Sequence, residues 1–256
     1  ISTHSLIEEI MLLANQSIAN HLSGNKIKFI HRNHEQISNE DLFHINGLLS
    51  QLSSTEIDSL PKIPTSKDVQ KLISQISNNE IKPLIENVLL RALPKANYST
   101  KNKGHFGLSF ENYCHFTSPI RRYPDLIIHR LLKGDKVESL EKTAIMNSNS
   151  EVVSLKAERE FTKIKQLRFL MNKENEVLSG RVNGMNRHGM FIQIDDILVD
   201  GYVRAEWMED DYYYFDENFY YFIGRRYKQK YKFGQKVTVK ILNISILQQR
   251  LDLKLV

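Results

Sequence analysis

The sequence predicts an α+β protein in which a mainly helical first part is followed by a five-stranded β-barrel of the OB type. Two observations predict this organisation. Apolar residues recur at helical spacing through much of residues 5–171, and after Asn172 the period changes abruptly to the alternation of short strands. We therefore expect two domains, residues 1–172 and residues 173–256.

The predicted helices of the first part cover residues 5–22, 39–52, 66–76, 81–93, 118–132 and 148–171. The first is amphipathic and should be buried along its apolar face, with Gly24 as its stop signal. Ser66 is expected to cap the third, with Asp68 in its first turn. Residues 98–116 break the helical pattern into a loop or short strands.

The predicted strands of the second part cover residues 177–182, 190–194, 198–203, 236–244 and 250–255. Turns are expected at Asn183-Gly184, His188-Gly189 and Asp195-Asp196. Roughly five strands in about eighty residues favour a small Greek-key barrel.

Composition excludes some classes of protein and leaves others open. A chain of 256 residues with 41% hydrophobic and 25% charged residues can form two ordinary globular cores. The net charge of +5 permits an anionic partner such as nucleic acid, although a solubility role gives the same excess. The single cysteine, Cys114, excludes an internal disulfide and favours a reducing, cytoplasmic location. No apolar run approaches the roughly 20 residues that span a bilayer, so we expect no membrane partner.

The most informative stretch is residues 114–132, CHFTSPIRRYPDLIIHRLL. Ser118 and Pro119 suit a helix start, yet Arg121 and Arg122 follow at once, where cations oppose the helix dipole at a cost of up to about 1 kcal/mol. Two interpretations are open. Arg121 pairs with Asp125 on the helix surface, or the guanidinium groups and free helix amides converge on a phosphate.

Two other constellations in this region are weaker. A nucleophilic triad of Ser118, Asp125 and His129 is disfavoured, because Ser118 precedes a proline and the other two lie one helical turn apart. A helix cap and a helical pair are favoured instead. His105, Cys114 and His115 match no common zinc spacing, so a buried structural cysteine is favoured.

In the barrel, a basic residue, an imidazole and an aromatic ring gather in Arg187-His188-Gly189-Met190-Phe191. Phe191 either stacks on a nucleic-acid base or points into the barrel core. Residues 224–236, GRRYKQKYKFGQK, carry only basic charges, interleaved with aromatic side chains, and follow aromatic runs at 211–215 and 219–222. This stretch is either a surface for single-stranded nucleic acid or a solvated loop over a small aromatic core.

Residues 91–132 resemble the signature of the ribonuclease II and ribonuclease R exoribonucleases, and HSLIEEIMLLAN at residues 4–15 resembles an earlier segment of the same catalytic domain. DDYYYFD and GRRYKQKYKFGQKVTVKI are similar to the C-terminal RNA-binding barrel of ribonuclease R. The resemblance implies that residues 1–172 are the C-terminal portion of a ribonuclease II-type catalytic domain and that residues 173–256 are an OB-fold RNA-binding domain.

The same resemblance implies processive, magnesium-dependent hydrolysis of single-stranded RNA from its 3′ end to nucleoside 5′-monophosphates. Arg121 matches the arginine that contacts the scissile phosphate, where it can stabilise charge that develops in the transition state. Glu158 matches an acidic residue beside the active site, and either Glu8 or Glu9 matches a glutamate near the 3′-terminal nucleotide. The full set of expected RNA contacts besides Arg121 is Arg122, Glu8, Glu9, His115, Ser118, Glu158, His188, Phe191, Arg225, Arg226 and Lys228.

One departure from the family pattern limits what this chain can do. The aspartates that hold magnesium in the family lie upstream of the matching segment, so we expect no metal site in this chain and little activity from it alone. Residues 195–200 and 209–211 are acidic but read as solvated turns. The start at Ile1 is expected of a piece of a longer protein.

An RNA helicase or another degradation-complex protein stays open as a partner. The alternative function is a non-catalytic RNA-binding or scaffold protein on the same framework.

Overall fold

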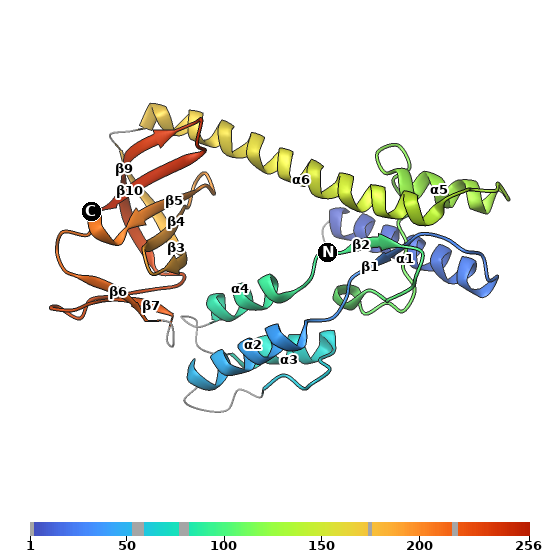
Figure 1. Cartoon of the computed structure of the whole chain (residues 1–256), viewed down its shortest axis with the longest axis horizontal. Helices are drawn as coiled ribbons and strands as arrows, with labels where there is room; N and C mark the ends of the chain where they lie inside the picture. The colour runs from blue at the N-terminus through green and yellow to red at the C-terminus, as the bar shows by residue number, and fades with distance from the viewer. Residues whose placement is uncertain (1–2, 53–58, 77–81, 174–175, 217–219) are drawn as a thin grey trace. The chain divides into compact units, whose positions relative to one another are not determined.

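Two compact units make up the chain in the computed structural model, which describes residues 3–52, 59–76, 82–173, 176–216 and 220–256 (Figure 1). The first unit contains Ile1–Leu42, Leu60–Lys71 and Arg91–Leu155, and the second contains Phe43–Ser59, Leu72–Leu90 and Lys156–Val256. The predicted division between residues 172 and 173 stays a prediction, and residues 174–175 beside it lie outside the described part of the chain.

The first part of the chain is mainly helical, as predicted. Its α-helices are α1 Thr3–Gly24, α2 Asn39–Leu52, α3 Ser66–Gln75, α4 Lys82–Ala92, α5 Tyr123–Leu132 and α6 Leu140–Leu170. The predicted start of the fourth helix, Ile81, lies outside the described residues. Short 3-10 turns are η1 Phe106–Leu108, η2 Met171–Lys173 and η3 Ala205–Trp207. Among the described residues, no helix combines the length and apolar character that crossing a membrane requires.

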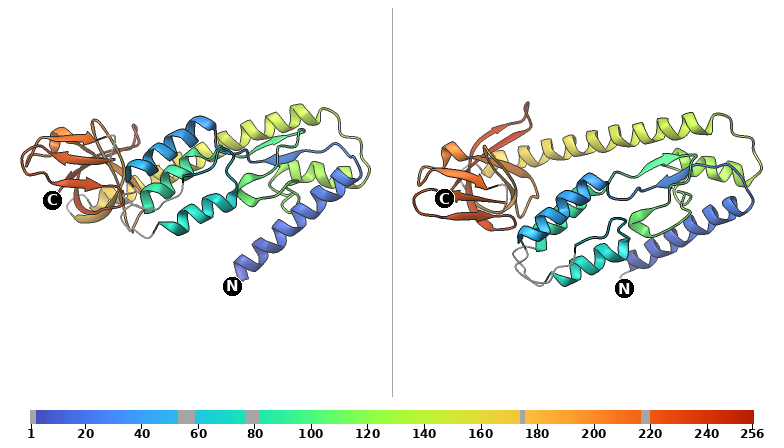
Figure 2. Two further views of the ribbon diagram at one scale, coloured as in Figure 1. Left: turned by 90° about the horizontal axis from the view of Figure 1, so that it is seen from below. Right: turned by 60° about the horizontal axis from the view of Figure 1, so that its bottom comes forward.

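Helix α6 begins eight residues earlier than the predicted start at residue 148, and the right view in Figure 2 shows it as one uninterrupted helix. The polar residues that suggested a later start lie inside it. Asn147 donates its side-chain amide to the carbonyl of Thr143 at 2.7 Å, and Ser148 donates its hydroxyl to the carbonyl of Ala144 at 3.1 Å. These side chains therefore bond back to the preceding turn instead of capping a new helix.

The core of the first unit joins α1 to α5 and the start of α6. Ala19 and Leu22 of α1 pack with Cys114 and Ile128 in one buried cluster. A second cluster contains Ile30, Tyr98, Ile127, Leu140 and Ala144. Strands β1 His31–Asn33 and β2 Asn97–Ser99 pair antiparallel, which places Tyr98 opposite Arg32.

The prediction that α1 is buried along its whole apolar face is wrong for the described residues. Its buried side chains, Asn15, Ala19 and Leu22, all lie in its C-terminal half. Leu6, Ile10 and Leu13 of the first half are more than half exposed, at 54%, 57% and 63%. Gly24 is the last helical residue and does not lie beyond the end. Periodicity identifies an apolar face, but not what covers it.

The N-terminal cap of α3 also differs from the prediction. Thr65, and not Ser66, makes the reciprocal capping contacts, because its backbone N–H donates to Asp68 Oδ2 at 2.7 Å and its Oγ1 accepts from the Asp68 backbone N–H at 3.3 Å. The Ser66 hydroxyl instead donates to the carbonyl of Phe106. Ser66 therefore links α3 to the 98–116 loop.

The second unit contains the predicted closed five-stranded barrel, with strand order β10-β5-β4-β3-β9. Its strands are β3 Val177–Asn186, β4 Gly189–Ile194, β5 Asp200–Arg204, β9 Lys236–Ser245 and β10 Arg250–Leu255. Turns occur at His188 and at Asp195-Asp196 as predicted. The expected turn at Asn183-Gly184 is wrong, since both residues lie within β3, where the pairing with β4 shifts register between Val182 and Gly184.

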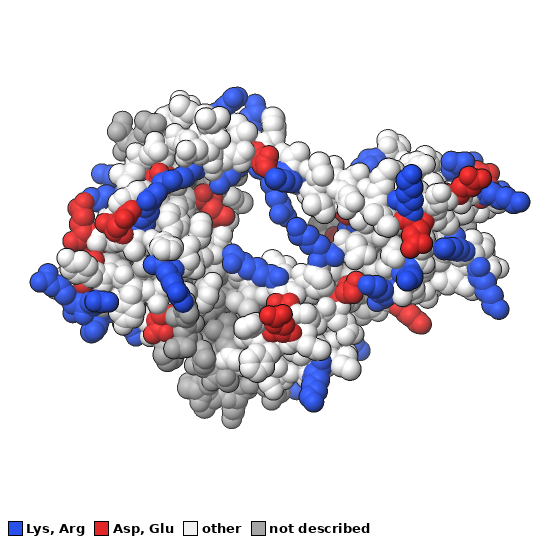
Figure 3. Space-filling model, in the orientation of Figure 1, with Lys and Arg blue, Asp and Glu red and all other residues white. Residues whose placement is uncertain are grey.

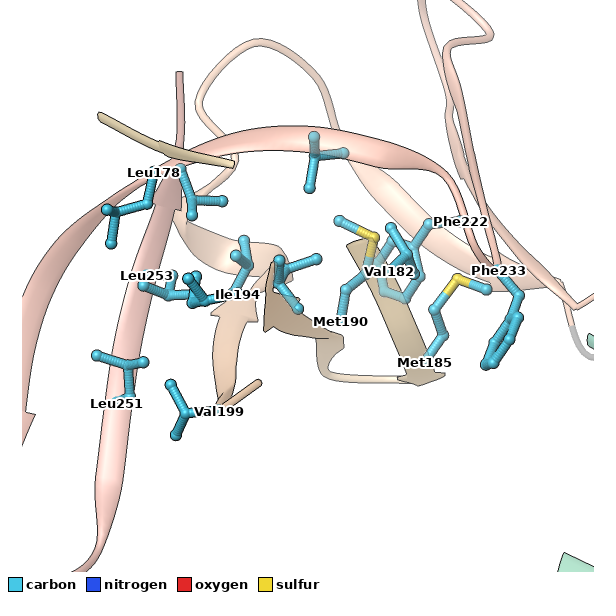
Figure 4. Packing of buried hydrophobic residues seen from close by; sticks show 14 of the residues in the cluster. Leu178, Val182, Met185, Met190, Ile194, Val199, Phe222, Phe233, Leu251 and Leu253 are labelled. Atoms are coloured by element: carbon cyan, nitrogen blue, oxygen red, sulfur yellow. The ribbon is translucent and has the colours of Figure 1, made fainter. Parts of the chain in front are cut away.

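A second, three-stranded antiparallel sheet lies in the segment between β5 and β9, where the sequence predicted no strand. Its strands are β6 Tyr213–Asp216, β7 Tyr221–Gly224 and β8 Lys230–Lys232. Phe222 of β7 is fully buried and joins the barrel core, as does Phe233 just after β8. Figure 4 shows both rings beside Met185 and Met190. The aromatic residues of this segment therefore extend the barrel core at one end.

Core packing yields the first prediction. Leu253 in β10 is fully buried and Leu247 is 96% exposed. We expect Leu253→Ala to lower the free energy of unfolding of the second unit by about 2–5 kcal/mol, because it leaves a cavity. Leu247→Ala should change it by less than about 0.5 kcal/mol. Urea unfolding followed by fluorescence of Trp207, the single tryptophan of the chain, measures both. Equal effects would contradict the barrel packing.

Candidate functional site

A buried carboxylate, Asp125, organises the turn that precedes helix α5. It is fully buried in the first turn of the helix. Its Oδ1 accepts the backbone N–H of Ser118 at 2.8 Å and Arg122 Nη2 at 2.8 Å, and its Oδ2 accepts Arg122 Nε at 3.0 Å. This bidentate contact with the Arg122 guanidinium gives the buried charge of Asp125 a partner of opposite sign. Residues 118–122 are thereby fixed as a turn against the start of the helix.

Three expectations for this stretch are corrected. The helix begins at Tyr123 and not at 118, with Arg122 at the N-cap position and Pro124 in the first turn. Ser118 is therefore not the cap. Arg122, and not Arg121, is the ion-pair partner of Asp125. The apparent conflict between Arg122 and the helix dipole disappears, because the carboxylate of Asp125 neutralises this cation.

Arg121, unlike Arg122, does not pair with Asp125. Its side chain is exposed, and within the part of the chain that the structure describes its guanidinium has no hydrogen-bond or ion-pair partner. Its backbone N–H bonds to the carbonyl of Ser118 at 3.3 Å, so its main chain belongs to the same fixed turn. A guanidinium held on an ordered turn with all its donors free can bind an anion.

The residues before this turn are held by Asn15 of helix α1, which is buried. Its Oδ1 accepts the backbone N–H groups of Phe116 at 2.9 Å and Thr117 at 3.2 Å, and its Nδ2 donates to the hydroxyl of Tyr113 at 3.0 Å. The thiol of Cys114 donates to the carbonyl of Asn15 at 3.5 Å. Burial raises the pKa of Cys114 to about 12, so it is a structural cysteine, as predicted.

Neither a nucleophilic triad nor a zinc site is assembled here. His129 Nε2 bonds to the carbonyl of Phe116 at 3.0 Å, and its ring stacks on that of Phe116, while Asp125 is taken up by Arg122. In the residues that the structure describes, no group of three or more His, Cys, Asp or Glu side chains is placed to hold a metal ion.

His115 is half-buried beside the turn, at the end of a chain of contacts. Its Nδ1 lies 2.9 Å from the hydroxyl of Tyr98, and Arg32 lies over the Tyr98 ring, 4.6 Å from its centroid. Burial, followed by the charges of Arg122 and Arg32, lowers the pKa of His115 to about 2. The imidazole is therefore neutral at physiological pH.

The predicted acidic contacts are not gathered at this turn. Glu8 and Glu9 are exposed on the first half of α1, and no hydrogen bond or ion pair joins them to residues 118–122 in the described structure. Glu158 is exposed on α6 and belongs to the second unit. The choice between Glu8 and Glu9 stays open.

In the barrel, a groove of ≈ 790 Å³ is lined by the predicted residues His188 and Phe191. Phe191 is 41% exposed whereas Met190 and Ile192 on either side of it are fully buried, so Phe191 points out of the core. Its ring lies 4.8 Å from that of Tyr202, directly opposite on β5. Tyr202 was missed from the sequence, although its alternation with the buried Gly201 and Val203 indicates an outward position.

Basic side chains in this groove surround the two rings. Lys163 and Arg187 contribute to its lining, together with Arg204 and Arg250, which also pair with Glu206 and Asp252 at 3.0 and 2.7 Å. The hairpin at its edge requires a glycine at 189, because a Cβ there would collide with the carbonyl of Val203. The groove thus combines exposed aromatic faces with cations.

A basic turn joins β7 to β8 and contains Arg225, Arg226 and Lys228, all exposed. Asp211 fixes it, because its carboxylate accepts the backbone N–H groups of Arg226 and Tyr227 at 2.8–3.0 Å. Figure 3 shows basic side chains gathered at the end of the sheet where β7 turns into β8. The turn is a preorganised cationic surface. Phe219, part of the second aromatic run, lies outside the described residues.

The carboxylates in the acidic turn at residues 195–200 hydrogen-bond or pair with neighbouring residues of the barrel. Asp195 accepts from Ser179 at 2.8 Å and pairs with Arg181 at 3.4 Å, and Asp200 accepts from Asn183 at 3.0 Å. These carboxylates therefore stabilise the barrel surface and are not collected around a common point.

Two family models match the chain. The RNB domain matches residues 2–134, and the S1 RNA binding domain matches residues 172–255. The sequence is 32% identical over 266 residues to the Ribonuclease R of Buchnera aphidicola subsp. Schizaphis graminum, covering 98% of this chain and 36% of that protein. The chain therefore spans little more than a third of the length of this relative.

Solved structures agree with these matches. Mycoplasma genitalium RNase R in complex with ribose methylated single-stranded RNA is similar with a TM-score of 0.86 and 28% identity, covering 99% of this chain and 42% of that one. Yeast Ssd1, a pseudonuclease, shares the fold with a TM-score of 0.62 and 19% identity, covering 84% of this chain and 28% of that one.

The contacts of Asp125 yield a second prediction. Asp125→Ala should lower the free energy of unfolding by about 3–5 kcal/mol, because it leaves the Arg122 guanidinium without its carboxylate and the Ser118 amide without an acceptor. Arg121→Ala should change it by less than about 0.5 kcal/mol, because that side chain is exposed. Urea unfolding followed by far-ultraviolet circular dichroism compares the two. A larger loss from Arg121→Ala would contradict the assignment of the ion pair.

The third prediction concerns pH. Although burial opposes it, the N–H groups of Tyr227, Arg226 and Tyr212 hold the pKa of Asp211 below its ordinary value. Because the folded-state pKa is lowered, Asp211 stabilises the fold above the ordinary carboxyl pKa, and this contribution is lost as the pH falls through the folded value. The stability difference between the native chain and Asp211→Asn should therefore shrink between neutral pH and about pH 3.

Unfolding monitored by Trp207 fluorescence at each pH measures this difference. Asp196→Asn is the matched control, since Asp196 is exposed and shows no partner in the described residues. A stability difference for Asp211→Asn that stays constant with pH would show that the carboxylate charge does not hold the turn.

Proposed function

Because the chain belongs to the RNB domain family, we propose that its parent protein is a 3′-to-5′ exoribonuclease of the ribonuclease R type. It hydrolyses single-stranded RNA processively to nucleoside 5′-monophosphates. Support comes from the paired RNB and S1 RNA binding matches and from similarity to proteins named Ribonuclease R over nearly the whole chain. Since this chain covers 36% of the first of them, the activity is proposed for the parent protein.

This proposal depends most on one observation, the different surroundings of Arg121 and Arg122. Arg122 is occupied by Asp125, whereas Arg121 is exposed on the same ordered turn with its guanidinium free among the described residues. Arg121 therefore contacts the scissile phosphate and stabilises the negative charge that grows on it in the transition state. Arg122 positions the turn and is at most a secondary phosphate contact, as is the Ser118 side chain.

The second unit binds the RNA chain through its barrel and its basic turn. In the barrel groove, bases stack on Phe191 and Tyr202 while His188 and the surrounding cations face the backbone. Arg225, Arg226 and Lys228 on the basic turn bind further phosphates, so their contribution falls as salt rises. Glu8 or Glu9, together with Glu158 and His115, completes the proposed set of RNA contacts.

Magnesium is required by this proposal, yet the described residues do not fit it. The buried carboxylates Asp125, Asp211 and Asp252 already bond to Arg122, to backbone amides and to Arg250 respectively. Magnesium needs several carboxylate and water oxygens around one point. We therefore propose that its ligands lie in a segment of the parent protein upstream of this chain.

Three finer points belong to the same proposal. The catalytic part ends near residue 172 and the RNA-binding part begins near 173. The parent protein works in the cytoplasm, which fits a single buried, unreactive cysteine. A helicase or another component of an RNA-degrading complex is a candidate protein partner.

The fourth prediction tests the role of Arg121 in the parent protein with magnesium and a single-stranded oligouridylate. Arg121→Ala should lower kcat by about 100-fold or more and weaken RNA binding by less than about tenfold, because the interaction strengthens in the transition state. Arg130→Ala is the control, since Arg130 is an exposed arginine at the other end of α5. Release of 5′-monophosphates measures turnover, and fluorescence anisotropy measures binding.

Other outcomes have distinct meanings. Equal losses in turnover and binding would reassign Arg121 to ground-state binding. A parent protein that binds RNA but releases no mononucleotide would favour the non-catalytic RNA-binding function. The 256-residue chain alone should bind weakly and release essentially no mononucleotide. Robust turnover by it would contradict the upstream location of the magnesium ligands.

A further inference from the structure

A chain of polar contacts runs from helix α6 to His115 across the core of the first unit. Glu151 of α6 accepts both Nη atoms of Arg32, at 2.6 and 2.9 Å, and Arg32 lies 4.6 Å from the centroid of the Tyr98 ring. The Tyr98 hydroxyl meets His115 Nδ1 at 2.9 Å. The described residues offer His115 Nε2 no hydrogen-bond partner. One edge of the imidazole is thus fixed and the other is unoccupied.

The contact with Tyr98 determines which nitrogen of His115 carries the proton. A phenol is a stronger acid than a neutral imidazole N–H, and an imidazole nitrogen is a stronger base than a phenolic oxygen. Burial raises the pKa of the Tyr98 hydroxyl to about 12, although the charge of Arg32 over the ring opposes this shift, so the hydroxyl keeps its proton. The O–H of Tyr98 therefore donates to Nδ1, which leaves the proton of the neutral imidazole on Nε2.

The backbone of Tyr98 is fixed as firmly as its hydroxyl. Its N–H donates to Ser148 Oγ of α6 at 2.9 Å, and it pairs with Arg32 across the two-stranded sheet. The backbone beside His115 is held by Asn15 through the N–H groups of Phe116 and Thr117. The orientation of the Nε2–H bond is therefore set by the fold before any ligand arrives.

The surroundings of His115 favour an anion and disfavour a second cation. Arg32 lies over the Tyr98 ring that bonds to His115, and Arg121 and Arg122 belong to the turn that begins three residues after it. Burial is the main cause of the lowered pKa of His115, and the charges of Arg122 and Arg32, followed by those of His105 and Arg121, lower it further. A neutral N–H donor inside a field of arginines can bind a phosphate oxygen without titrating.

We propose that the Nε2–H of His115 donates a hydrogen bond to the RNA phosphate that Arg121 binds, and that Tyr98, Arg32 and Glu151 are positioning residues that hold it there. This inference rests on the proposed function and assigns His115 a definite atom, tautomer and partner. His115 is a neutral donor here, neither an acid–base catalyst nor a metal ligand.

The fifth prediction needs no variant for its first part. Nitrogen-15 NMR of the native 256-residue chain should show His115 protonated on Nε2 and bare on Nδ1. Addition of the tetranucleotide UUUU should shift the Nε2 resonance of His115 and leave that of His21, exposed at the end of α1, unchanged.

Variants extend the test to affinity for UUUU. His115→Phe keeps the ring but removes the donor, and should weaken binding about tenfold. His115→Gln, whose amide supplies an N–H near the position of Nε2, should retain most of the affinity. Tyr98→Phe should weaken binding about threefold and mix the two tautomers, a change that a merely structural role for Tyr98 would not produce.

Two results would overturn the inference. If Nδ1 of His115 is protonated, or if UUUU leaves Nε2 unmoved while Arg121→Ala still weakens binding, His115 is not the donor and the proposed function stands. If neither His115 nor Arg121 affects UUUU binding, the phosphate contact of the proposed function fails as well.

Discussion

The candidate site of the first unit depends on the hydrogen bonds and the ion pair that the buried carboxylate of Asp125 accepts. An isolated charge in the core costs several kcal/mol, so Asp125 needs donors of its own. It takes them from the Ser118 amide and the Arg122 guanidinium, and in doing so fixes residues 118–122 as a turn. Arg121 is the exposed cation that this arrangement leaves over. Arg121 is therefore the candidate phosphate contact because Asp125 pairs with Arg122 instead.

The second unit applies the same principle at Asp211. There a carboxylate at the start of the three-stranded sheet binds the amides of a basic turn, and Gly224 leaves the room it needs, because a Cβ at 224 would collide with Asp211 Oδ2. Asp125 and Asp211, one in each unit, thus each fix the backbone of a turn that carries basic side chains.

The barrel strands could be predicted because period-two alternation directly reports which residues face the core. The same alternation left Phe191 ambiguous, because it does not say which face of the strand is covered. The 41% exposure of Phe191 between two fully buried neighbours shows that it faces outward, and Tyr202 lies opposite it on the same face. The start of α5 was misplaced because Ser-Pro is a sound local signal, whereas the partner of Asp125 is decided by tertiary burial. The sheet containing Phe222 was missed because its strands are only three or four residues long, too short for a clear alternation. Resemblance singled out Arg121 as the candidate phosphate contact, which stays a prediction, and only the structure shows that Asp125 pairs with Arg122 instead.

The measurement that tests this account most directly is a titration of the chain with single-stranded RNA followed by the arginine Nε–H NMR signals. The signal of Arg122 should be protected from solvent exchange in the free chain and nearly unchanged by RNA, because its Nε already donates to Asp125. The signal of Arg121 should shift and become protected as RNA binds. A shift at Arg122 with none at Arg121 would contradict the assignment of the phosphate contact.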